Sequence, residues 1–160
     1  TRDALFVAVG RDSAVAPGSA ARTLAVPFQR DRGVMAQYFQ AADVYLHAAN
    51  ADTFPLAVLE AMACGTPVVA TAVGGVPEQI RPIDLGAVSA GRVGAATGVL
   101  VDAGDAAQMA AAVETLGANP GARQVLGENA RADVEARFDL ERQADAYLDW
   151  YEELLCDRPI

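Results

Sequence analysis

Short apolar runs alternate with longer amphipathic stretches along the chain. Five short, largely apolar runs predict strands at residues 5–9, 23–26, 44–46, 68–70 and 98–101, and the first of them predicts a strand buried on both faces. Apolar residues at helical spacing, in places with Pro near the start or Gly after the end, predict helices at residues 33–42, 55–63, 76–80, 106–116, 122–137 and 140–155. The polar stretch 11–22 and the Gly- and Ala-rich stretch 82–96 show no clear period and predict loops.

The alternation of short strands and helices predicts an α/β fold made of parallel β-α-β units. Because crossover helices cover both faces of a parallel sheet, we expect an open, doubly wound, Rossmann-like sheet that the C-terminal helices close. A length of 160 residues fits one domain. Ligands bind such sheets at the carboxyl ends of the strands, so the residues that follow each strand are the first candidates for a site.

The charge balance excludes several classes of partner. The formal net charge is −9, and all 12 cationic residues are arginines. Nucleic acids and anionic membrane surfaces bind basic faces, so neither is expected as the main partner. No apolar run approaches the ~20 residues of a membrane span, and no signal peptide is recognised. Two distant thiols, Cys64 and Cys156, predict a reducing, cytoplasmic setting, and a single histidine, His47, predicts no metal site.

The segment 50–65 carries the strongest chemical signal. It follows a predicted strand and opens a predicted helix, whose unpaired N–H groups and partial positive charge suit an anion such as a diphosphate. Pro55 fits the start of this helix, because its missing N–H would be unpaired there in any case. Leu56 still offers an N–H donor, and Thr53 offers a hydroxyl.

Glu60 is the one charged residue of this apolar helix, and its neighbours predict a buried carboxylate. Helical side chains lean toward the N-terminus, so the carboxylate would point at the helix start and could accept hydrogen bonds from a ribose diol. Asp52, in the preceding loop, could hold the hydroxyls of a sugar. The alternative is structural: Asp52 would cap the helix, and Glu60 would bond to a backbone group.

Seven residues separate Asp52 from Glu60, and the sequence AMACGTPVVA follows at residues 61–70. This pattern resembles the signature of group 1 (family 4) glycosyltransferases, which are retaining, nucleotide-sugar-dependent enzymes of the GT-B fold. Further similarity extends over most of the chain, at residues 41–44, 74–78, 97–101, Phe138 and 141–155. The resemblance implies that the chain is the C-terminal, donor-binding half of a GT-B fold.

The resemblance implies a role for each matched residue. Glu60 would bind the ribose hydroxyls of the nucleotide, and Asp52 would contact the donor sugar as the candidate catalytic residue. The residues that follow Asp52 would contact sugar and phosphate, largely through their backbone: Thr53, Phe54, Pro55 and Leu56. The chain departs from the family pattern in three places, since Asp52 stands where Glu is commoner, Pro55 stands where Gly is usual, and residues 81–96 form a longer connection.

The family also carries an Arg and a Lys on a preceding strand-loop, and an N-terminal domain that holds the acceptor. Residues 1–160 are therefore expected to be a single nucleotide-sugar-binding domain, in a fragment that lacks the acceptor domain and the first part of the C-terminal domain.

The implied reaction moves a sugar from a nucleoside diphosphate, with UDP the leading choice, to a hydroxyl acceptor, with no metal and no cofactor. A lipid acceptor would place the protein at the inner face of a membrane. The alternatives are a non-catalytic nucleotide-sugar-binding module and a nucleotide-sugar epimerase on the same fold.

Several other residues leave two interpretations open. Gly75, in a second Gly-rich turn before a helix, could face the same anion or form only a tight turn. Gly10 could pass close to the nucleotide or simply end its strand. Pro27 could flank the base or pack in the core. His47 is expected to be packed and hydrogen-bonded rather than catalytic.

The cysteines and the C-terminal aromatic residues are expected to be structural. Cys64 lies at an apolar helix end and should be inert, whereas Cys156 should be exposed. An aromatic series at helical spacing should pack the last helix, against the missing N-terminal domain rather than against a sugar: Phe138, Tyr147, Trp150 and Tyr151.

Overall fold

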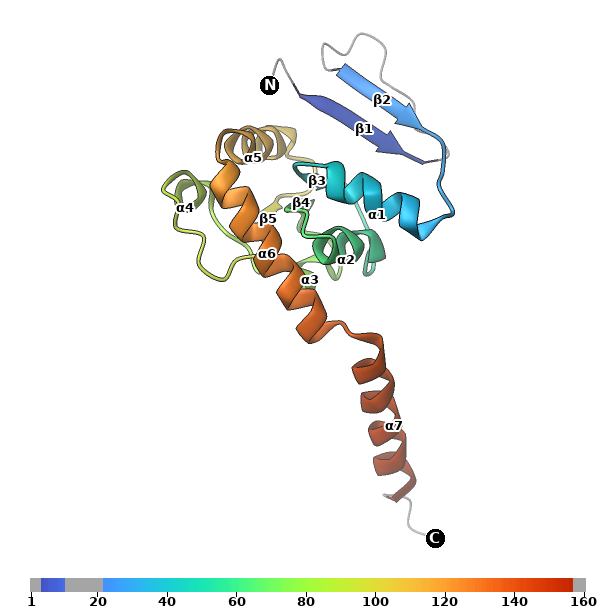
Figure 1. Ribbon diagram of the computed structural model, residues 1–160. Coiled ribbons are helices and arrows are strands. Elements are labelled where there is room, and N and C mark those ends of the chain that lie inside the picture. Colours follow the sequence, from blue (N-terminus) through green and yellow to red (C-terminus); the bar gives the residue numbers. More distant parts are fainter. Residues whose placement is uncertain (1–3, 11–21, 157–160) are drawn as a thin grey trace.

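The computed structural model describes residues 4–10 and 22–156, and it confirms the α/β class with parallel strands (Figure 1). The described strands form two sheets rather than one continuous sheet. In the first sheet β1 (Leu5–Val9) pairs with β2 (Arg22–Val26). In the second the order is β3 (Tyr45–His47), β4 (Val68–Thr71) and β5 (Gly98–Val101). All three strand pairings are parallel.

The helices of the described ranges agree with the predicted ones to within a few residues, apart from one addition. They are α1 (Arg32–Ala41), α2 (Leu56–Ala63), α3 (Val76–Gln79), α4 (Leu85–Ser89), α5 (Ala106–Ala118), α6 (Pro120–Arg137) and α7 (Leu140–Cys156).

The addition is α4, and it corrects the loop predicted over residues 82–96. The Asp84 side chain begins this helix by accepting a hydrogen bond of 2.8 Å from the N–H of Ala87. Val88 is completely buried. Five residues are too few to show a helical period in the sequence. The helix forms because of its N-cap and its one buried side chain.

The core is centred on β4, all of whose residues are buried, as expected for a parallel strand covered on both faces. Val68 and Ala70 enter one cluster, with side chains of α1, α2, α3 and α6. Val69 enters the other, with side chains of α4, α5 and α6. α6 packs closely beside the end of α2, because a Cβ on Gly127 would lie only 2.1 Å from a backbone oxygen of Gly65.

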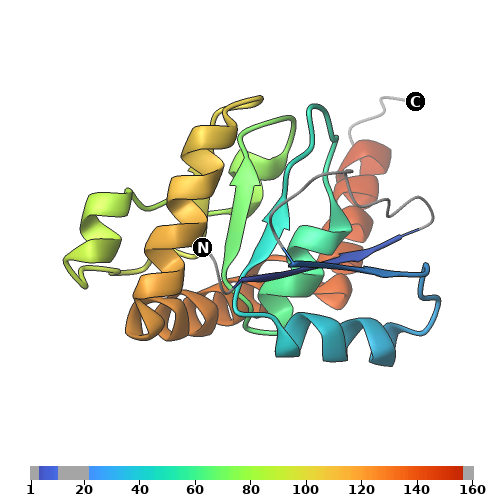
Figure 2. The same cartoon turned by 90° about the horizontal axis from the view of Figure 1, so that it is seen from above.

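β1, β2 and α7 lie outside this core (Figures 1 and 2). Leu5, Val7 and Leu24 are about half exposed. α7 extends away from the body of the chain, and none of its residues is buried. Pro27 is exposed, so the interpretation of Pro27 as a core residue is wrong. None of the helices in the described ranges is long and apolar enough to cross a membrane.

Candidate functional site

The loop between β3 and α2 lies at the carboxyl end of the three-stranded sheet, where the fold predicts a ligand site. α2 begins at Leu56, with Pro55 as its N-cap and no side-chain cap. The structural alternative for Asp52, that it caps this helix, is therefore wrong. Pro55 is buried, and its carbonyl accepts a hydrogen bond of 3.1 Å from the buried amide of Gln79.

Two neighbouring elements hold this loop in place. The Thr71 hydroxyl, at the end of β4, donates a hydrogen bond of 2.6 Å to the Ala49 carbonyl. The Gly75 N–H donates one of 2.8 Å to the Thr53 carbonyl. Gly74, at φ 50°, approaches so closely that a Cβ there would lie 1.7 Å from the Asp52 carbonyl oxygen. The Gly-rich turn is thus part of the same site, and its glycines are required by this close approach.

The two acidic side chains differ in exposure. The Asp52 carboxylate is about one-third exposed, and one oxygen lies 3.5 Å from Nε2 of His47. Glu60 is exposed, so the expectation of a buried carboxylate is wrong: α2 packs Val58, Ala61 and Met62 inward and leaves Glu60 on its open face. Within the described part of the chain the Glu60 carboxylate makes no hydrogen bond, so the interpretation that it bonds to the backbone also fails.

The charges of both acids act on Tyr45, on β3. Its burial, together with the nearby carboxylates of Glu60 and Asp52, raises the pKa of Tyr45 to about 12. His47, on the same strand, is packed as expected, with only 12% of its side chain exposed. The expectation that His47 is hydrogen-bonded is wrong at Nε2, which is buried without a hydrogen bond and lies next to the Asp52 carboxylate.

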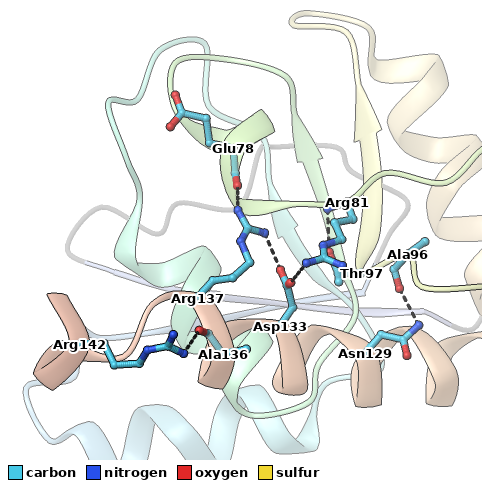
Figure 3. A network of polar contacts seen from close by, with 9 residues as sticks. All are labelled: Glu78, Arg81, Ala96, Thr97, Asn129, Asp133, Ala136, Arg137 and Arg142. Carbon is cyan, nitrogen blue, oxygen red and sulfur yellow. Dashed lines mark hydrogen bonds and ion pairs between the residues drawn. The ribbon is translucent and has the colours of Figure 1, made fainter. Parts of the chain in front are cut away.

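The sequence did not predict an ion-pair network that joins α6 to the segment after α3 (Figure 3). Asp133 is buried and bonds to Arg81 and Arg137, each at 2.7 Å. The Arg137 guanidinium also stacks on Phe138, 4.6 Å from the ring centroid, and the Phe138 ring packs against Phe54 in the loop at 5.9 Å. The i,i+4 spacing of Asp133 and Arg137 was visible in the sequence, whereas the partnership with Arg81 was not.

Phe138 therefore does not belong with the aromatic side chains of α7. It is the C-cap residue of α6, whereas Tyr147, Trp150 and Tyr151 contact one another on the exposed helix. The prediction that the whole series packs the last helix is wrong for Phe138, because this residue ends α6 and its ring contacts Phe54.

The remaining candidates lie at other strand or helix ends. Gly10 follows β1 and donates a hydrogen bond to the Val26 carbonyl, and Pro27 follows β2. Their proposed contacts with the nucleotide stay predictions. Cys64 is half-buried, and this burial, with Glu60 nearby, raises the pKa of its thiol, which agrees with an inert residue. Cys156 is exposed, as expected.

Comparison with known proteins gives the family context. The profile of the family described as "Glycosyl transferases group 1" matches residues 20–133. The chain is 36% identical over 141 residues to the D-inositol 3-phosphate glycosyltransferase of Mycobacterium marinum, covering 88% of this chain and 28% of that protein. It is 38% identical over 133 residues to the protein of the same name from Xylanimonas cellulosilytica, covering 83% and 28%. The chain thus spans less than a third of the length of these relatives.

Solved structures agree with this assignment. Sucrose-phosphate synthase from Thermosynechococcus elongatus superposes with a TM-score of 0.73 at 29% identity, over 96% of this chain and 39% of that one. Anabaena HepE, solved in complex with UDP, superposes with a TM-score of 0.69 at 23% identity, over 82% and 32%; at this identity the likeness concerns the fold. The family profile covers well over half of the chain, and the chain therefore belongs to the group 1 glycosyltransferases.

Proposed function

We propose that this chain is the donor-binding part of a retaining glycosyltransferase, which moves a sugar from a nucleoside diphosphate to a hydroxyl acceptor. The observation that carries the proposal is the position of Asp52 and Glu60. Asp52 lies in the loop before α2, at the carboxyl end of a parallel sheet, and Glu60 lies exposed on α2 itself. Both carboxylates contribute to the raised pKa of Tyr45.

Each group has a role in this proposal. The exposed Glu60 carboxylate accepts hydrogen bonds from the two ribose hydroxyls. The N–H groups at the start of α2, from Leu56 onward, face the diphosphate, and the helix dipole adds a partial positive charge there. Asp52 accepts from hydroxyls of the sugar. Phe54 and Gly75 fix the course of the backbone between these groups, because a Cβ on Gly75 would lie 2.7 Å from the Phe54 ring.

The chemistry follows from this arrangement. As the glycosidic bond to the diphosphate breaks, positive charge develops on the sugar ring and negative charge on the leaving group. Fixed dipoles aimed at these charges stabilise the transition state without reorganisation. No step of this scheme calls on a metal or an added cofactor, and the acceptor hydroxyl would be held by a part of the protein outside this chain.

Relatives suggest the donor. HepE has been solved with UDP and with UDP-glucose, so we propose a UDP-sugar. The setting proposed for the whole enzyme is the cytoplasm, or the inner face of a membrane if the acceptor is a lipid. A second candidate is a non-catalytic nucleotide-sugar-binding module. It is favoured by Pro55, which removes one backbone donor near the diphosphate, and by a net charge of −9 with no lysine.

Calorimetric titration with UDP, GDP, ADP and UDP-glucose tests the donor site. We expect saturable binding of one nucleotide class and a loss of about tenfold or more, about 1.4 kcal/mol, in Glu60→Ala. Glu152→Ala, an exposed glutamate on α7, is the matched control and should bind normally. Equal binding by Glu60→Ala and the control would overturn the assignment of the ribose site. Sugar transfer by the longer protein, lost in Asp52→Asn, would separate an enzyme from a binding module.

A further inference from the structure

His47 is the one histidine of the chain, and the alternation of side chains along β3 places its ring. Residues two apart on a strand point to the same face, so His47 shares a face with Tyr45, and the two ring centroids lie 6.4 Å apart. Tyr45 in turn packs edge-on against Phe39 of α1, at 5.3 Å. His47 therefore ends a packed row of rings at the carboxyl end of β3, where the loop that carries Asp52 begins.

The backbone is fixed on both sides of the contact between His47 and Asp52. His47 pairs with Ala70 of β4, and its carbonyl accepts a hydrogen bond of 3.3 Å from the Thr71 hydroxyl. The Asp52 carbonyl faces Gly74 so closely that no side chain fits between them. The distance of 3.5 Å between His47 Nε2 and Asp52 Oδ2 is therefore set by two anchored segments.

The Nε2 atom of His47 lacks the partner that a buried polar atom normally has. It is buried and makes no hydrogen bond, although an unpaired buried atom loses its bonds to water without replacement. Within the described ranges Asp52 is the one acid in ion-pair contact with it. The separation is only about 0.3 Å beyond an ordinary N–H···O hydrogen bond. The Asp52 side chain is 34% exposed, so it has room to turn toward the ring.

We propose that His47 is the positioning residue of Asp52: its Nε2–H donates a hydrogen bond to one carboxylate oxygen and leaves the other oxygen for the hydroxyls of the donor sugar. This role deepens the proposed function and rests on it. Nε2 carries a proton in the charged ring and in one of the two neutral tautomers, and a carboxylate acceptor selects that tautomer. A carboxylate held at one oxygen keeps one orientation, so less conformational freedom is lost when the sugar binds.

Nuclear magnetic resonance of the donor-free chain tests the hydrogen bond directly. Because the chain has a single histidine, the ring signals of His47 need no further assignment. We expect a downfield Nε2–H signal in the native chain, as for a proton in a charged hydrogen bond, and the loss of this signal in Asp52→Ala.

Glu60→Ala is the matched control for this measurement. Glu60 is the other acid of the site, and its charge acts on Tyr45 as that of Asp52 does. Within the described part of the chain no ion pair joins Glu60 to His47. The Nε2–H signal should therefore remain downfield in Glu60→Ala, and a loss in both variants would show a general effect of charge rather than a specific partner.

Two variants of His47 separate positioning from packing. His47→Gln keeps an N–H donor near the place of Nε2, whereas His47→Met is of similar length and has no donor. UDP lacks the sugar that Asp52 is proposed to hold, so the ratio of the affinities for UDP-glucose and UDP isolates the sugar contact. Measured by calorimetry, this ratio should fall about fivefold in His47→Met and stay near the native value in His47→Gln.

The outcomes separate this proposal from the proposed function. A downfield Nε2–H signal that is absent from the native chain, or unchanged in Asp52→Ala, overturns the positioning role. So does a His47→Met variant that weakens UDP and UDP-glucose equally, because the ring would then act through packing alone. If the native chain binds neither ligand while the signal still depends on Asp52, the hydrogen bond stands and the donor site is wrong.

Discussion

At the scale of single residues, the site depends on a close approach between two backbones. Gly74 lies at φ 50°, and its α-carbon faces the Asp52 carbonyl so closely that no side chain fits. Gly91 has a similar φ of 69°, but a Cβ there would meet nothing within 4 Å. The two glycines share a backbone conformation and differ only in their surroundings.

This difference gives a prediction. Gly91→Ala should lower the free energy of unfolding by about 1 kcal/mol, the strain of a left-handed alanine. Gly74→Ala adds a clash with the loop, so it should cost at least about 2 kcal/mol more and weaken nucleotide binding. Urea denaturation and calorimetry measure the two effects. Equal costs for the two variants would show that the loop can move away without penalty.

Tyr45 makes stability depend on alkaline pH. Its pKa in the folded chain is about 12, against an ordinary value of 10.0. Between these values the unfolded chain has lost the proton and the folded chain keeps it, so the free energy of unfolding falls as pH rises, by about 2 to 3 kcal/mol in all. Below pH 10 this contribution is fully present. Denaturation curves from about pH 9 to 12 should show this fall in the free energy of unfolding for the native chain and a smaller fall for Tyr45→Phe. The same dependence on pH in both chains would contradict the burial of this hydroxyl.

At the scale of elements, Asp133 joins the end of α6 to Arg81, in the segment that follows α3. Only 5% of this side chain is exposed, and it is paired with two arginines that are themselves partly exposed. Asp133→Ala should lower the free energy of unfolding by about 2 kcal/mol, because two charged hydrogen bonds are lost. The loss is not larger, because solvent screens the charges of the two arginines that remain. Glu135→Ala removes an exposed i,i+4 pair with Arg131 and should not change stability measurably. Similar unfolding midpoints for both variants would show that the Asp133 network contributes no more to stability than an exposed ion pair.

α7 contributes little to the stability of the rest of the chain. None of its residues is buried, so deleting residues 140–160 should shift the melting temperature by less than about 3 °C. Leu126→Ala, at a completely buried position of α6, is the comparison variant. It should lower the free energy of unfolding by about 2 to 5 kcal/mol and therefore lower the melting temperature clearly in the same calorimetric scan. A large loss on deletion would mean that the apolar face of α7 packs on the chain itself rather than on another domain.

At the scale of the whole molecule, the net charge of −9 repels an anionic donor. Raising the salt concentration from about 0.01 to 0.1 M shortens the screening length from about 30 to 10 Å. The affinity for UDP should therefore rise over this range, whereas the affinity for uncharged uridine should stay constant. A fall in UDP affinity with salt would indicate a local cluster of cations stronger than the overall charge.

The sequence by itself determined the local elements and pointed to the segment 50–65 as the candidate site. Short apolar runs located all five strands and helical spacing located the longer helices, because both patterns reflect which faces of an element are buried. The spacing of Asp52 and Glu60 identified the candidate site, because it follows from the geometry of one loop and one helix. The sequence did not predict α4, because this short helix is stabilised by one N-cap side chain and one buried valine rather than by a repeated pattern.

Only the tertiary structure decided how these elements meet. The sheet is divided in two because strand pairing depends on edges that no local pattern encodes. Glu60 is exposed because α2 packs against its neighbours on one side only. Asp133 meets Arg81 across 52 positions, and Gly74 meets Asp52 across 22, through contacts that exist only once the chain is folded. Local patterns report which faces are buried, whereas partners distant in sequence are set by packing of the whole chain.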